Sequence, residues 1–201
     1  MYITKEADER KREILESATE LFLEKGYKHT SVEDIAEKIG VVKGTCYHYF
    51  SNKEELYHQA LKQQGEKYIS SLNLILYDSN MSAKERLQRM LMSAESRFFS
   101  SAKGGNTANL NAYNSETIER LRLHCFRELA KGLEKCIQDG NQEGYFHVLN
   151  PQMCANAICH AIFGITCVHA SIDEIVKGMH QYTAALLHIS VADLKYGGEL
   201  K

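Results

Sequence analysis

The stretch "GVVKGTCYHYFSNKEEL", residues 40–56, decides the fold of this 201-residue chain. Gly40 follows a segment with apolar residues at helical spacing, and Ser51 introduces another such segment. Glycine commonly ends helices and serine commonly begins them, so we expect a short helix over 43–49 between two others. Two short helices joined by a turn at Gly40–Val41 predict a helix-turn-helix motif over about 31–50.

The helical spacing of this segment divides its side chains between an inner and an outer face. Residues four apart on a helix lie on one side, so three apolar residues should face inward: Val42, Cys46 and Phe50. Four other residues should form the outward face: Lys43, Gly44, Tyr47 and His48. That outward face is cationic, aromatic and, at the glycine, unhindered.

Each of these residue types has a use on DNA. Lys43 can meet a phosphate or a guanine edge, and Thr45 can touch a thymine methyl or donate a hydrogen bond. Gly44 has no side chain, so the backbone can approach the floor of a groove. Tyr47 and His48 can donate to phosphate oxygens.

Flanking residues extend the predicted interface. Thr30 and Ser31 stand at the start of the preceding helix, where free amides and the helix dipole attract a phosphate. Lys53, at the start of the next helix, can hold the flanking DNA backbone. The sequence between Lys43 and Lys53 contains no acidic residue, so we expect a positive local surface. The alternative is that "TCYHYF" is a plain core helix, because aromatic side chains most often pack in cores.

The longer stretch "TSVEDIAEKIGVVKGTCYHYFSNKEELY", residues 30–57, resembles the DNA-binding domain of TetR-type transcriptional regulators. The resemblance covers about residues 8–68 and includes the lead-in "KREILESATELFLEKGY". It implies a homodimer that binds a palindromic, double-stranded operator, and release when a small molecule enters a C-terminal helical domain. At Val42 the sequence departs from the family, which usually has Ser or Thr there. The resemblance implies eight DNA-facing residues: Thr30, Lys43, Gly44, Thr45, Tyr47, His48, Tyr49 and Lys53. We add Ser31 to this set.

The composition of the chain is compatible with a DNA-binding regulator but does not by itself indicate one. The formal net charge is −2, and residues 1–68 hold 11 Lys/Arg against 13 Asp/Glu, so only the placement of charge can indicate DNA binding. No apolar run reaches the roughly 20 residues that span a bilayer. The charged N-terminus lacks a signal core. The six cysteines form no CxxC pair and are typical of free thiols. We therefore expect a cytoplasmic protein with no membrane partner.

Helix signals predict an all-α chain. Four serines stand three residues before a carboxylate and predict helix starts: Ser31–Asp34, Ser51–Glu54, Ser82–Glu85 and Ser171–Glu174. A further start is predicted at Asn150–Pro151, and four glycines predict helix ends: Gly26, Gly40, Gly140 and Gly144. The helices expected are 5–25, one after Ser31, 43–49, one from Ser51 to about Tyr77, 82–101, 115–139, 151–169 and 171–190.

Two domains are expected. Residues 1–68 form a three-helix, helix-turn-helix DNA-binding domain, and residues 69–201 form a helical ligand-binding and dimerisation domain. The resemblance implies that helices 151–169 and 171–190 pair with their copies in a dimer. A pocket for an apolar or aromatic effector is expected among helices of residues 68–139, although the same side chains suit any helical core. The candidate lining residues are Leu72, Met90, Phe98, Phe99, Tyr113, His124 and Phe126.

The sequence raises two other possible functions, a metal- or redox-responsive regulator and an enzyme. Neighbouring cysteines and histidines, such as His124–Cys125 and Cys159–His160, raise the alternative of a redox- or metal-responsive regulator. Adjacent helical residues point about 100° apart, so such pairs do not naturally share one metal ion. Enzyme signatures such as GxSxG, HExxH or a phosphate-binding glycine loop do not occur. We expect no enzymatic activity, no cofactor and no bound metal.

Overall fold

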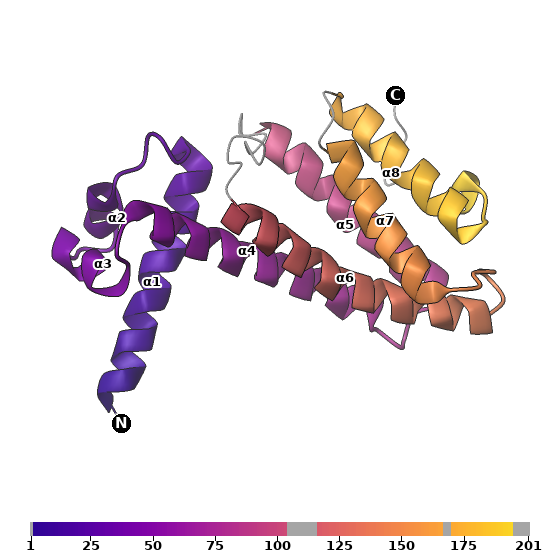
Figure 1. Cartoon of the computed structure of the whole chain (residues 1–201), viewed down its shortest axis with the longest axis horizontal. Helices are drawn as coiled ribbons and strands as arrows, with labels where there is room; N and C mark the ends of the chain where they lie inside the picture. The colour runs from indigo at the N-terminus through magenta and orange to yellow at the C-terminus, as the bar shows by residue number, and fades with distance from the viewer. Residues whose placement is uncertain (1, 104–115, 167–169, 195–201) are drawn as a thin grey trace. The chain divides into compact units, whose positions relative to one another are not determined.

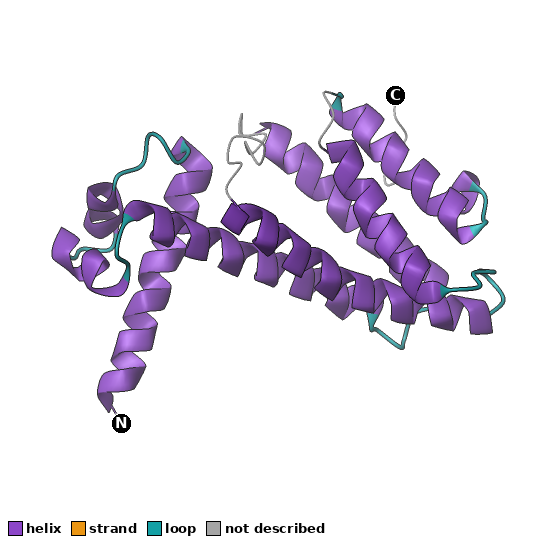
Figure 2. Ribbon diagram, viewed as in Figure 1, coloured by secondary structure: helices purple, strands orange, loops and turns teal. Residues whose placement is uncertain are grey.

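The computed structural model describes residues 2–103, 116–166 and 170–194, and these form helices without a strand (Figures 1 and 2). The predicted all-α class is therefore confirmed for the described residues. In chain order the elements are α1 (Tyr2–Lys25), α2 (Val32–Lys38), α3 (Lys43–Tyr49), α4 (Lys53–Leu76), α5 (Ala83–Lys103), α6 (Glu116–Gln142), α7 (Pro151–Thr166), α8 (Ile172–Leu187) and a short 3-10 helix, Val191–Asp193.

The chain divides into two compact units, one built mainly from residues up to Lys67 and the other beginning at Tyr68. In the first unit, α1, α2, α3 and the start of α4 share one apolar core. Five apolar residues at helical spacing on α1 enter this core: Ile14, Leu15, Ala18, Leu21 and Phe22. From α2 the core receives Val32, Ile35 and Ala36.

Serine caps begin three helices as predicted. Ser31 and Asp34 form a reciprocal capping box on α2, and Ser171 and Glu174 form one on α8. At the start of α5, the Glu85 amide donates to Ser82 Oγ over 3.3 Å, and the Ser82 amide donates to the Glu85 carboxylate over 3.0 Å. These caps satisfy amides that a helix start leaves without partners.

The prediction for α4 was off by one residue. Asn52, not Ser51, accepts the hydrogen bond from the helix, through its Oδ1 and the Glu55 amide at 2.8 Å. Ser51 instead donates its amide and hydroxyl to the Glu55 carboxylate. Asparagine caps helices as well as serine does, so the sequence offered two neighbouring starts and the geometry chose the second.

One predicted helix end was also wrong. Gly26, Gly40 and Gly144 have positive φ and lie in turns, but Gly140 lies inside α6, which continues to Gln142. A Cβ on Gly140 would come within 2.0 Å of the Phe146 ring. This glycine therefore makes room for a core side chain rather than ending the helix.

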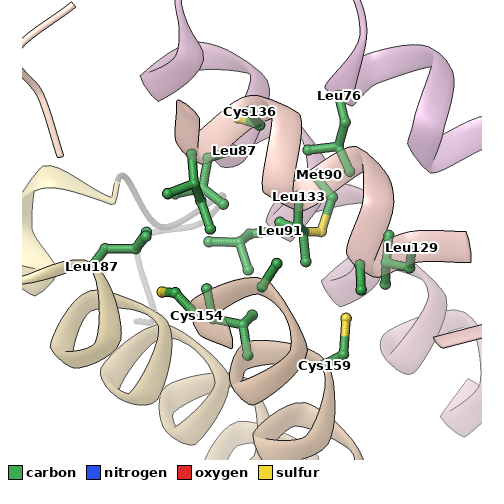
Figure 3. Packing of buried hydrophobic residues seen from close by; sticks show 14 of the residues in the cluster. Leu76, Leu87, Met90, Leu91, Leu129, Leu133, Cys136, Cys154, Cys159 and Leu187 are labelled. Carbon is green, nitrogen blue, oxygen red and sulfur yellow. The ribbon is translucent and has the colours of Figure 1, made fainter. Parts of the chain in front are cut away.

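The second unit has its own core, to which helices α4 to α8 all contribute (Figure 3). Figure 3 shows leucines of α5 and α6 meeting between the helices, among them Leu87, Leu91 and Leu133. Cysteines also fill this core, and Cys136 Sγ lies 3.3 Å from the Ala83 carbonyl oxygen. Cysteine here serves as a small apolar residue.

Two sets of polar side chains in this second core are paired. The Arg86 guanidinium donates to the Leu76 carbonyl oxygen at 2.8 Å and to the Asp139 carboxylate at 2.8 Å, which ties α4, α5 and α6 together. On the other side of the unit, the buried side chains of Glu95 on α5 and His180 on α8 are hydrogen-bonded through Oε1 and Nε2. Buried charges persist in cores only when they have such partners.

Candidate nucleic-acid interface

The turn between α2 and α3 is built by backbone hydrogen bonds around one glycine. Gly40 has φ of 71°, a conformation that glycine adopts without strain. The Gly40 amide donates to the Glu37 carbonyl oxygen over 3.1 Å, and the Val41 amide donates to the Ala36 carbonyl oxygen over 2.9 Å. These bonds end α2 and turn the chain into α3 within four residues, Ile39 to Val42.

The inner face of α3 is narrower than predicted. Cys46 and Phe50 are 1% and 2% exposed and belong to the first core, as expected. Val42 is 75% exposed, so its assignment to the inner face was wrong. Val42 is the extended residue before the helix, with φ −76° and ψ 147°, and helical spacing does not apply to a residue outside the helix.

The four residues predicted to face outward are all exposed: Lys43, Gly44, Tyr47 and His48. Among the described residues, no heavy atom of another segment lies within 4 Å of the position that a Cβ on Gly44 would take. The Tyr47 ring is 45% exposed. Thr45 and Tyr49 are partly buried at the edges of this face. The face therefore presents a cation, a phenol and an imidazole beside bare backbone.

The charge on Lys43 has a partner that the sequence analysis missed. Its Nζ donates to the Glu33 carboxylate on α2 at 3.1 Å, and this hydrogen bond raises the pKa of the Lys43 ammonium. Glu33 thus places a negative charge beside the predicted positive surface, and residues 43–53 alone do not show it because the acid comes from ten residues earlier in the chain. Exposed ion pairs of this kind contribute little to stability, so Lys43 can exchange Glu33 for another anion.

Thr30 does not belong to the exposed set. It is 1% exposed, and its hydroxyl lies 3.1 Å from the Leu21 carbonyl oxygen and 2.9 Å from that of Gly26. The hydroxyl thus fastens the end of α1 to the loop that follows it. Because this hydroxyl is buried and hydrogen-bonded within the chain, we assign the Thr30 side chain a structural role.

Ser31 is exposed but already occupied. Its Oγ accepts the Asp34 amide at 3.0 Å, and its own amide donates to the Asp34 carboxylate at 2.7 Å. The hydrogen bonds from the Ser31 amide and then the Ser31 hydroxyl lower the pKa of Asp34. A phosphate approaching the start of α2 would meet this carboxylate, so the helix start is a poorer anion site than the sequence indicated.

Lys53 is held over an aromatic ring. Its Nζ lies 4.2 Å from the centre of the Tyr27 ring, a cation–π contact that leaves the ammonium able to accept an anion on its other side. Lys53 and Lys25 both lie close enough to Asp34 to contribute to its lowered pKa. Tyr27 was not singled out from the sequence, because it lies 26 residues before Lys53 and nothing local connects the two.

The candidate pocket residues lie in different surroundings in the second unit. Leu72 and Met90 are 2% and 1% exposed and pack in the core, whereas Phe126 is partly buried and His124 exposed. Tyr113 lies outside the described residues, and the side chains of Phe98 and Phe99 do as well. Leu72 and Met90 therefore lie in the core of the second unit, and Phe126 packs against the same core.

Cysteine and histidine neighbours point apart. Cys159 is buried while His160 is exposed on the same turn of α7. Burial raises the pKa of the Cys136 and Cys159 thiols to about 12, and it also raises the pKa of Cys46 and Cys154. Thiols with raised pKa hold little thiolate and react slowly with oxidants. Within the described residues no cluster of three His, Cys, Asp or Glu side chains is placed to hold a metal ion.

This geometry, a supporting helix, a tight turn and a second helix with a polar, unobstructed face, defines a helix-turn-helix protein. Comparisons with known proteins specify the class further. Residues 14–60 match the family model described as bacterial regulatory proteins, tetR family. The segment includes all of α2 and α3.

Relatives and solved structures agree with that match. The chain is 34% identical over 89 residues to the HTH-type transcriptional repressor KstR2 of Mycobacterium tuberculosis, which is 44% of either protein. It thus matches less than half the length of this curated relative. A TetR/AcrR-family regulator from Thermobifida fusca aligns with 89% of this chain and 97% of its own, at 26% identity and a TM-score of 0.64.

The fold likeness extends to a structure with a bound small molecule. The complex of SmeT with triclosan, from Stenotrophomonas maltophilia, covers 94% of this chain and 96% of its own at 16% identity and a TM-score of 0.68. The family model and the curated relatives thus indicate a DNA-binding domain of the tetR type in the N-terminal part of the chain, and the solved structures show that the fold as a whole is similar to that of TetR/AcrR-family regulators.

Within the residues that the structure describes, no helix has the length and apolar character needed to cross a membrane.

Proposed function

We propose that this chain is a ligand-responsive transcriptional repressor. It binds a palindromic operator as a dimer in the bacterial cytoplasm, and a small molecule releases it. The observation that carries the proposal is the outer face of α3: Lys43, Gly44, Tyr47 and His48 are exposed together while Cys46 and Phe50 fix the helix from beneath. A helix seated this way can enter the major groove of DNA.

The DNA-facing set that we propose is smaller than the sequence suggested. It keeps Lys43, Gly44, Tyr47 and His48 on the outer face, with Thr45 and Tyr49 at its edges and Lys53 at the start of α4. Thr30 is omitted because its hydroxyl is buried and bonded. Ser31 is retained only as the cap that positions α2.

Dimerisation through α7 and α8 is part of the proposal. Two recognition helices must stand about 34–36 Å apart to enter successive major grooves, so a dimer of fixed spacing is required. A ligand that favours another spacing would lower operator affinity by shifting the population of dimer conformations. Large apolar side chains remain exposed on these helices, among them Met153 and Tyr182, and a partner subunit could cover them.

An effector site in the second unit is also part of the proposal. The names of relatives include repressors, and the SmeT–triclosan complex has the same fold. An apolar or aromatic effector would have to open the packing around Leu72 and Met90 to reach those side chains. A bound effector would raise the melting temperature with concentration and lower operator affinity in parallel.

The first test is operator binding by Lys43→Ala and Tyr47→Phe. We expect Lys43→Ala to weaken binding about tenfold or more and to reduce the salt dependence, because a phosphate contact releases counterions. Fluorescence anisotropy at several salt concentrations measures both effects. Lys67→Ala is the matched control, since Lys67 also pairs with a glutamate, Glu16, but lies 14 residues along α4 from Lys53. Equal affinities for the wild type, Lys43→Ala and Lys67→Ala would contradict the proposed contacts.

A further inference from the structure

Val42 is an exposed apolar residue at the entrance to the recognition helix. Its side chain is 75% exposed, whereas the neighbouring Val41 is partly buried and packs against the first core. The residue that follows, Lys43, begins α3 and belongs to its polar outer face. The fold therefore gains little packing from the isopropyl group of Val42.

Val42 also breaks a local rule of helix formation. It is the N-cap residue of α3, and its side chain makes no cap hydrogen bond. Serine, threonine, aspartate or asparagine at this position would satisfy an amide of the first turn, as Ser31 does on α2 and Ser171 on α8. Where a residue violates a local preference without a packing gain, function is the usual reason.

The chemistry of an exposed valine fits one feature of DNA. In the major groove, thymine alone among the four bases presents a C5-methyl group, and apolar side chains recognise it. A β-branched side chain has few rotamers, so Val42 loses little conformational freedom when it makes such a contact. Gly44, two residues on and open on its outer side, lets the backbone come close enough for a short side chain to reach a base.

We propose that Val42 reads a thymine methyl group in each half of the operator. The proposal rests on the function proposed above, because it presumes that α3 enters the major groove. It makes Val42 a specificity residue, distinct from Lys43 and Tyr47, which contact phosphate or the edges of other bases. Serine at this position would strengthen the helix cap but lose the contact.

The experiment uses the full-length protein and synthetic DNA. Duplexes that the wild type binds are first selected from a random-sequence pool. Each thymine of the selected site is then replaced in turn by deoxyuridine, which removes only the methyl group. Affinities are measured for the wild type, Val42→Ala, Thr45→Ser and Tyr47→Phe.

For the wild type, we expect one thymine per half-site whose replacement lowers affinity about three- to fivefold, the effect of one buried methyl group. Replacement in both half-sites should lower it about fifteenfold, since the two contacts are equivalent. Val42→Ala should bind the thymine and deoxyuridine duplexes almost equally. Tyr47→Phe and Thr45→Ser should show the same loss of affinity for deoxyuridine duplexes as the wild type. Thr45→Ser is included because Thr45 is the residue of α3 whose side chain also carries a methyl group.

The outcomes separate the two proposals. If the wild type selects no DNA sequence, the proposed function fails and this inference fails with it. If DNA is bound but deoxyuridine has no effect, or has the same effect in Val42→Ala, then DNA binding stands and the role of Val42 is overturned. If Thr45→Ser, and not Val42→Ala, binds the thymine and deoxyuridine duplexes equally, the methyl contact belongs to Thr45 instead. Because the Val42 side chain is exposed, Val42→Ala should leave the melting temperature unchanged.

Discussion

The outer face of α3 and the core around α6 use the same residue types in opposite ways. Gly44 on α3 has open space where a Cβ would stand, and Gly140 on α6 has the Phe146 ring there. Lys43 forms an exposed ion pair with Glu33, and Arg86 forms a buried one with Asp139. On α3 these residues contribute little to folding, which leaves them available for a partner. In the second unit they hold the helices together.

The largest effect should come from the buried arginine. Arg86→Met would leave Asp139 and Glu143 without their buried partner, and we expect a loss of about 3–5 kcal/mol in the free energy of unfolding. Urea unfolding followed by circular dichroism measures it. Arg89→Met, an exposed arginine on the same helix, is the control and should change stability by less than about 0.5 kcal/mol. Similar losses of unfolding free energy in both variants would mean that the buried ion pairs of Arg86 stabilise the fold no more than an exposed arginine does.

The two glycines should separate folding from binding. Gly140→Ala should cost about 1–3 kcal/mol, because the new methyl group overlaps Phe146 and the helix must shift. Gly44→Ala should leave stability equal or raise it by up to about 1 kcal/mol, since alanine favours helix. Thermal unfolding of the two variants tests this contrast.

Operator binding supplies the second half of that test. We expect Gly44→Ala to lower affinity at least tenfold, because a methyl group separates the backbone from the groove floor. A stable Gly44→Ala variant with wild-type affinity would remove Gly44 from the interface. A Gly140→Ala variant as stable as the wild type would show that Phe146 has room to move.

The smallest effect concerns pH. Hydrogen bonds from the Ser31 amide and hydroxyl lower the pKa of Asp34, and hydrogen bonds from the Ser171 hydroxyl and amide lower that of Glu174. A carboxyl whose pKa is lower in the folded state stabilises the fold above its unfolded pKa, near 4, and this stabilisation is lost as pH falls through the folded pKa.

We therefore expect the melting temperature to fall as the pH drops below about 4. The Asp34→Asn variant should lose less than the wild type over that range, because asparagine does not titrate. Glu37→Gln, an exposed glutamate on the same helix and outside the capping box, is the control and should follow the wild type. A steeper fall in Asp34→Asn than in the wild type would contradict the role given to this cap.

Local patterns predicted most of the helices, and they failed where a partner came from elsewhere in the chain. The capping boxes at Ser31, Ser82 and Ser171 follow from spacing of three residues, which is a property of one helix turn. Gly140 was mistaken for a helix end because its real constraint, Phe146, acts across a turn. The candidate pocket stays a prediction, since aromatic and methionine residues occur in cores and in pockets alike.

The sequence by itself determined that the chain is helical, that residues 31–50 form a helix-turn-helix, and that Lys43, Gly44, Tyr47 and His48 share a face, because these depend on neighbours within one or two helix turns. Only the tertiary structure decided which of the candidate side chains are exposed. It buried Thr30 under the end of α1, paired Lys43 with Glu33 and left Val42 in solvent. Exposure and pairing depend on which helices pack together, and that information is spread over the whole chain.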